Sequence, residues 1–215
     1  MLTLYEEFFL ISIDDYTGMV ASRAAETLHY GLAGAMLSEL ALEGKLSIED
    51  ERVIVLNDTP LGDEKLDAML ATLAASPKQR KATRWINELS ERKLIRQVAD
   101  GLAAKGILTI EKKRYLWVIP YDAYPQQDAS AKYWVKHYLR AIVLGGEKPE
   151  PGVVALLSLL KACRLLNLVF TKDERKAAAN KVADLVQGES YGEAVARTLD
   201  EIELAAATAA MATTG

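Results

Sequence analysis

Two stretches of the chain, LALEGKLSIEDERVIVL at residues 40–56 and LAAKGILTIEKKRYLWV at residues 102–118, repeat one pattern at a constant offset of 62 residues. In each stretch a helical pattern ends on a glycine, an alternating strand follows, and a charged segment of four residues precedes a second apolar strand. The charged segments, residues 49–52 and 111–114, are expected to form the turns of β-hairpins. The repeat therefore predicts two units, each a helix followed by a hairpin.

The rest of the chain is mostly helical in pattern. Thr3 and Glu6 form a capping box before an apolar run, and Asp63 is placed to cap a later helix with apolar residues three and four apart. No long linker divides the chain. We therefore predict a mainly α fold, a single globular domain over residues 1–215, with two short β-hairpins near residues 46–56 and 107–119. The helix-then-hairpin units are winged-helix-like.

Composition narrows the functional classes. The chain has 215 residues, of which 50% are hydrophobic and 26% charged, so it fits an ordered globular protein. One cysteine and two histidines exclude a disulfide scaffold and argue against a metal site. No phosphate-binding loop, nucleophile elbow or dinucleotide fingerprint occurs, so we expect no catalytic residue and no cofactor. An export signal consists of a basic segment followed by an apolar one, and the beginning of this chain does not show that pattern. We therefore expect a cytoplasmic location.

Positive charge is concentrated in one segment. The chain carries 26 basic and 30 acidic residues, a net charge of −4, which argues mildly against a dedicated nucleic-acid binder. Residues 78–96 nevertheless contain seven basic and only two acidic residues. An anionic partner is therefore expected at this place.

Four stretches together resemble the Golgi phosphoprotein 3 family: LTLYEE at 2–7, GLAGAMLSELALEGKL at 31–46, DTPLGDEKLDAML at 58–70, and the second repeat stretch. The resemblance implies a mostly helical domain with hairpins. In eukaryotic members it also implies a peripheral protein that binds phosphatidylinositol 4-phosphate on the cytosolic Golgi face and recruits cargo enzymes through their tails. The Ala-rich composition and the absence of a eukaryotic-style N-terminal extension suggest a bacterial member.

The resemblance also implies where a lipid headgroup would bind. The eukaryotic pattern uses a Trp, an Arg within a G-L-R-G motif, and two basic residues three apart. The aligned positions here are Ala24, Ala33, Arg92 and Ile95, so only Arg92 is retained. Losing the Arg and the Trp removes a bidentate phosphate donor and an amphipathic anchor.

From the residues themselves, Arg92 and Arg96 are spaced by four and share one helix face. We predict lipid headgroup binding by a basic set consisting of Arg92, Arg96, Lys93 and Arg84. The alternative is a solvated face whose charges pair with Glu88 and Glu91.

The second hairpin carries a further candidate contact, made by Tyr115, Leu116 and Trp117. Neighbouring residues of a strand point to opposite sides, so Leu116 and Trp117 cannot both face the core. We predict contact with a membrane or with another copy of the chain. The family resemblance links this hairpin to self-association, and Trp and Tyr are suited to the headgroup boundary. A plain buried strand is the alternative.

These observations favour a non-catalytic peripheral membrane adaptor that binds anionic lipid, such as phosphatidylinositol 4-phosphate, through the basic segment, with protein cargo and a homo-oligomer as expected partners. One alternative is a winged-helix nucleic-acid binder that uses residues 111–114 as its wing tip. Another is a cytosolic oligomerising adaptor that has lost lipid binding.

Overall fold

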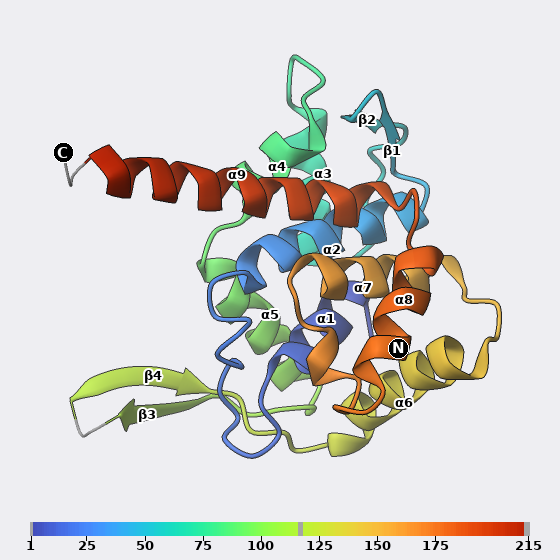
Figure 1. Cartoon of the computed structure of the whole chain (residues 1–215). Coiled ribbons are helices and arrows are strands. Elements are labelled where there is room, and N and C mark those ends of the chain that lie inside the picture. Colours follow the sequence, from blue (N-terminus) through green and yellow to red (C-terminus); the bar gives the residue numbers. More distant parts are fainter. Residues whose placement is uncertain (1, 116–117, 213–215) are drawn as a thin grey trace.

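The computed structural model describes residues 2–115 and 118–212, and its architecture is mainly helical (Figure 1). The helices are α1 (Leu4–Ser12), α2 (Leu28–Leu42), α3 (Glu64–Ala74), α4 (Ala82–Leu89), α5 (Lys93–Ala104), α6 (Ala129–Gly145), α7 (Pro151–Ala162), α8 (Arg175–Leu185) and α9 (Ser190–Ala212), with a 3₁₀ turn η1 (Leu166–Leu168). Two antiparallel hairpins pair β1 (Leu46–Glu49) with β2 (Arg52–Val55), and β3 (Glu111–Tyr115) with β4 (Ile119–Ala123). The predicted mainly α fold with two short hairpins is confirmed.

Helix α2 is the centre of the molecule and packs against α1, α3, α4, α5, α7 and α9. Two of its glycines make this possible. A Cβ atom at Gly31 would overlap the ring of Phe8 in α1, and one at Gly34 would overlap Val195 in α9. The absence of side chains at these two positions lets helices pack closely against α2 on both sides.

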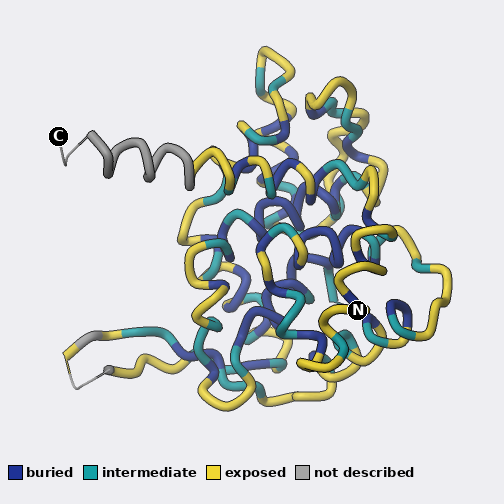
Figure 2. Tube along the Cα trace, viewed as in Figure 1, coloured by how far each residue is buried: buried dark blue, intermediate teal, exposed yellow. Residues whose placement is uncertain are grey.

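Helix α1 is buried beneath neighbouring helices. Figure 2 shows the buried residues of the whole chain in dark blue. Its large side chains are at most 5% exposed: Leu4, Tyr5, Phe8, Phe9, Leu10 and Ile11. The Thr3 amide donates to Glu6 Oε2 over 3.1 Å, and Lys105 at the end of α5 forms an ion pair with Glu6 at 2.7 Å. Glu6 of the predicted capping box thus serves two partners, one at the helix start and one on another helix. The predicted cap at Asp63 also forms, since its Oδ1 accepts from the amides of Lys65 and Leu66 at 3.0 Å.

The first hairpin has the predicted turn. Glu49 pairs with Arg52, and the two residues between them, Asp50 and Glu51, have positive φ angles of 48° and 64°. A two-residue turn with both φ angles positive matches the twist of the strands that it joins.

The second hairpin differs from its prediction. Gly106 ends α5 with a φ of 71°, as Gly44 ends α2 with a φ of 67°. The strand pairing then continues through residues 111–114, with Glu111 opposite Ala123 and Tyr115 opposite Ile119. The hairpin therefore spans residues 111–123, and the predicted turn at 111–114 is wrong. The positions equivalent to Asp50 and Glu51 are both lysines, and lysine lacks the short polar side chain that eases aspartate into positive φ.

Candidate functional site

The basic segment runs from the loop before α4 to the first turns of α5. In its first half, Arg80 and Arg84 both bind Glu88, at 2.6 and 2.9 Å. The Arg80 guanidinium also lies 5.0 Å from the ring centre of Trp85. Arg84, one of the predicted headgroup donors, is therefore already hydrogen-bonded to a carboxylate.

The second half of the segment is paired in the same way. Lys93 contacts Glu91 at 2.7 Å. Arg96 contacts Asp100 on its own helix at 2.9 Å and Asp122 on β4 at 3.1 Å, so it links α5 to the second hairpin. Part of the positive charge that the sequence concentrates here is balanced locally.

Arg92 differs from these three residues. It is the exposed residue directly before α5, and its guanidinium makes no hydrogen bond or ion pair with the part of the chain that the structure describes. Its charge also acts on His29 of α2. Burial lowers the pKa of His29, and the positive charge of the Arg92 guanidinium lowers it further. The positive end of the helix dipole lies at the same place, so the start of α5 favours an anion.

The positions that align with the eukaryotic headgroup site bring no further charge to Arg92. Ala24 and Ala33 are fully buried, and Ile95 packs partly buried against the core. Ala24 instead supports the start of α2, where its carbonyl oxygen accepts from the Leu28 amide at 2.8 Å. Of the four aligned residues, Arg92 is the one that carries a charge.

The predicted contact residues of the second hairpin are placed in part. Tyr115 is the last residue of β3, whereas Leu116 and Trp117 lie outside the described residues. Val118, which follows them, is 77% exposed. The hairpin projects away from the helical body (Figure 1).

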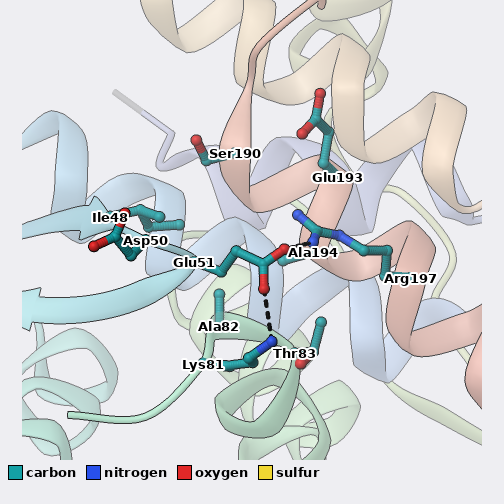
Figure 3. Close-up of a pocket in the computed structure, with 10 residues that line it drawn as sticks. All are labelled: Ile48, Asp50, Glu51, Lys81, Ala82, Thr83, Ser190, Glu193, Ala194 and Arg197. Carbon is teal, nitrogen blue, oxygen red and sulfur yellow. Dashed lines mark hydrogen bonds and ion pairs between the residues drawn. The ribbon is translucent and has the colours of Figure 1, made fainter.

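A cavity of about 290 Å³ lies where the first hairpin turn, the start of α4 and the start of α9 meet (Figure 3). The Glu51 carboxylate lies between two cations: Lys81, at 2.7 Å, and Arg197 of α9. Glu51 also binds through its backbone, since its carbonyl oxygen accepts from the Ala82 amide at 2.9 Å. Hydrogen bonds and charge from Lys81 and Arg197 lower the pKa of Glu51, so it remains ionised.

This arrangement joins the first hairpin turn to α4 and α9. The lining contains carboxylates, cations and the hydroxyls of Thr83 and Ser190, but neither a histidine nor a cysteine. Elsewhere among residues 2–115 and 118–212, no group of three or more histidine, cysteine or acidic side chains is placed to hold a metal ion. Sequence reasoning missed the Glu51–Arg197 pair because its partners are 146 residues apart.

Within the described part of the chain, no helix has both the length and the apolar character needed to cross a bilayer.

Comparison with known proteins gives two findings. A family model described as Golgi phosphoprotein 3 (GPP34) matches residues 4–202. The vacuolar protein sorting-associated protein 74 of Eremothecium gossypii is 28% identical over 166 residues, which cover 66% of this chain and 49% of that protein. The chain thus spans about half the length of this relative.

Proposed function

Because this chain belongs to the Golgi phosphoprotein 3 family, we propose that it is a peripheral membrane adaptor that binds anionic lipid through the basic segment. The family is non-catalytic, and its known members are peripheral Golgi adaptors that bind phosphatidylinositol 4-phosphate. In this proposal Arg92 is the first phosphate donor, Arg96, Lys93 and Arg84 add a positive field, and protein cargo is the second partner.

The observation that carries the proposal is the state of Arg92. It is exposed, lies at the positive end of α5 and has no carboxylate partner in the described chain. A lipid phosphate could therefore bind it without displacing an existing ion pair. An exposed guanidinium can donate two parallel hydrogen bonds to a phosphate.

The remaining basic residues set the strength of binding. Arg84, Lys93 and Arg96 each share their charge with a carboxylate, so a phosphate would compete with Glu88, Glu91 or Asp100. Such a surface attracts anionic headgroups as a class more than it selects one of them. Because exposed charges are screened over about 8 Å at physiological ionic strength, added salt should release the protein.

The test is co-sedimentation with phosphatidylcholine vesicles that contain no anionic lipid, phosphatidylserine or phosphatidylinositol 4-phosphate, at low and high salt. Binding to both anionic vesicles at low salt, lost at high salt, is the expected result. Binding that survives high salt, or that selects phosphatidylinositol 4-phosphate over phosphatidylserine, would mean a shaped pocket instead. No binding under any condition would refute lipid recognition and leave the oligomerising adaptor.

A matched pair of variants assigns the binding to Arg92. Arg92→Glu should weaken binding by about 30-fold, since each basic residue near an anionic surface contributes about 1 kcal/mol and reversal both removes that attraction and adds a repulsion of similar size. Lys176→Glu makes the same charge change at an exposed position of α8 that has no ion pair with the described residues. Equal weakening by both variants would mean that only net charge matters.

The second hairpin is the proposed place of self-association or membrane contact. It projects from the body, and Val118 beside the predicted contact residues is exposed. Trp117→Asp should shift an oligomer toward monomer in analytical ultracentrifugation or reduce vesicle binding. If neither changes, Trp117 makes no such contact.

Nucleic-acid binding loses its structural support. Residues 111–114, the proposed wing tip, lie within β3 and pair with β4 instead of forming the turn. Each of these four residues pairs with an acidic or neutral residue of β4: Glu111 with Ala123, Lys112 with Asp122, Lys113 with Tyr121, and Arg114 with Pro120.

A further inference from the structure

The exposed face of α6 carries an unusual concentration of aromatic side chains. Tyr133, Trp134 and Tyr138 are 60%, 63% and 43% exposed, and they occur within six residues. His137 completes the group: its ring stacks on Tyr133 with 5.7 Å between the ring centres and lies edge-on to Trp134 at 6.0 Å. Large apolar surface of this kind, gathered on one face, is typical of an interaction site.

The charge pattern of the same helix is one-sided. From Ala129 to Gly145, α6 contains Lys132, Lys136 and Arg140 and no carboxylate. Its cations are met from other elements, by Asp15 for the two lysines and by Glu174 for Arg140 at 2.5 Å. The aromatic face itself has no acidic residue.

A cavity of about 880 Å³ opens beside this face. Its walls come from the loop at residues 14–18, from β3 and from α6. Lys113, Lys136 and Arg140 are its cations and Asp14 and Asp15 its carboxylates, and Lys113 is paired with Glu111 of its own strand at 3.0 Å. Tyr16, which is 98% exposed, stands at its edge.

Polar side chains that line the cavity are tied to one another and to the backbone. Lys132 is buried, and its ammonium group donates to the Ile13 carbonyl oxygen and binds Asp15. Burial would raise the pKa of Asp15, but the hydrogen bonds and charges of Lys132 and Lys136 outweigh it and lower that pKa. Asp14 is occupied in the turn, where its Oδ1 accepts from the Thr17 amide at 2.8 Å. Both acidic side chains of the cavity are therefore engaged within the protein.

We infer that the aromatic face of α6, together with the adjoining cavity, is a lipid-contact surface that lies in the headgroup layer of an anionic membrane. This inference rests on the proposed function and adds a second contact to it, on a different helix from Arg92. Tyrosine and tryptophan are the side chains that combine an apolar body with a polar end and that favour the bilayer interface. A helix with aromatic residues on one face and flanking basic residues is typical of binding in the interface plane.

Two observations favour a membrane over another occupant. The helix that carries the face has no carboxylate that would repel anionic headgroups, and its three cations are balanced by Asp15 and Glu174 from other elements. The cavity also includes Lys113 of β3, so the face is continuous with the second hairpin, the element already proposed to contact a membrane.

A site-specific probe tests insertion directly. Trp134→Cys, labelled with an environment-sensitive fluorophore, should show a blue shift and increased emission with vesicles containing phosphatidylserine, and quenching by lipids labelled near the headgroup. Cys163 will not compete for the label, because it is buried and burial raises its thiol pKa to about 12. Ala71→Cys is the control, on an exposed turn of α3 at the opposite end of the molecule from α6 (Figure 1), and its label should not respond.

A binding experiment completes the test. The double variant Trp134→Ser with Tyr138→Ser should bind the same vesicles about tenfold more weakly, because two exposed rings lose their apolar contact with lipid. Its thermal unfolding should match the unmodified chain, since both side chains are exposed in the native state.

The outcomes separate the inference from the proposed function. If the unmodified chain does not bind anionic vesicles, both are refuted. If it binds and Arg92→Glu weakens it, while the Trp134 label and the double variant show no effect, the proposed function stands and the α6 surface is refuted. If the double variant changes only the oligomeric state, the face is a contact between copies and the inference is also overturned.

Discussion

At the scale of single residues, the close packing at the centre depends on glycines that the sequence places within a helix. Glycine weakens a helix by about 1 kcal/mol relative to alanine, so a glycine pair inside α2 requires compensation. Packing supplies it, because Phe8 and Val195 occupy the space that Cβ atoms would fill at Gly31 and Gly34. The helix propensity lost at two positions is offset by close contact of α2 with α1 and α9.

Gly31→Ala should therefore destabilise the protein by about 1–3 kcal/mol, as expected for overpacking in a full core. Gly145→Ala is the matched control: it lies at the end of α6, no atom would approach its Cβ within 4 Å, and the change should be neutral or stabilising by up to about 1 kcal/mol. Urea unfolding of both variants measures the difference. Equal stability of the two would contradict the close approach of Phe8.

At the scale of elements, the start of α1 gathers three carboxylates. Glu6 is paired with Lys105, and Glu39 accepts from the Leu4 amide at 2.5 Å. The Glu7 carboxyl group has no hydrogen bond or ion pair with the described residues, and burial, with the nearby charges of Glu39 and Glu6, raises its pKa from 4.5 to about 7. The first turn of this helix therefore holds a carboxyl group that folding makes harder to ionise.

A pH dependence follows from the sign of this shift. Because the pKa of Glu7 is higher in the folded chain than in the unfolded one, its ionisation costs stability as the pH rises from about 4.5 through 7. Glu7→Gln should stabilise the protein by about 1–2 kcal/mol near pH 8 and have little effect near pH 5. Denaturant unfolding at both pH values measures this, with the exposed Glu201→Gln as control. An equal gain at both pH values would assign the effect to packing.

The first hairpin gives a second prediction at this scale. Glu51 holds a φ of 64° while pairing with Lys81 and Arg197. Glu51→Ala and Glu51→Gly both remove these ion pairs, but only glycine also relieves the backbone conformation. In thermal unfolding, Glu51→Gly should therefore have a higher midpoint temperature than Glu51→Ala. A higher midpoint for Glu51→Ala would show that the positive φ at position 51 does not strain a residue that carries a side chain.

At the scale of the whole molecule, α9 closes the core. It packs against α2, α4 and α7, and its fully buried Val195 lies against Gly34. The buried apolar residues form one cluster that includes side chains from α1 to α9. The first and the last helix thus contribute to the same interior.

Val195→Ala should lower the stability of the entire fold, by about 1–3 kcal/mol, and not merely loosen α9. If residues 1–215 form a single cooperative domain, unfolding followed by circular dichroism and by tryptophan fluorescence should shift together. Leu56→Ala, a truncation of an exposed residue, should leave the transition in place. Two separate transitions would show that α9 unfolds on its own.

The sequence by itself determined the mainly helical fold, the capping residues Glu6 and Asp63 and the first hairpin turn, because each depends on neighbours within a few residues. The basic segment was also evident, since it is a local concentration of charge. The second turn was predicted at the wrong place because the repeat only shows that residue types recur. How far the strand continues was decided by its pairing with β4, which the repeat does not reveal.

Only the tertiary structure decided which basic side chains of the segment are unpaired and so available to bind an anion. Arg96 pairs with Asp122 from another element, while Arg92 has no such partner in the described chain, and no spacing rule distinguishes the two. The α6 face was missed for a related reason. Its aromatic residues follow a helical pattern that is equally typical of a core, and they became an exposed surface only because Leu139, Ile142 and Val143 on the opposite face are the ones that pack inward.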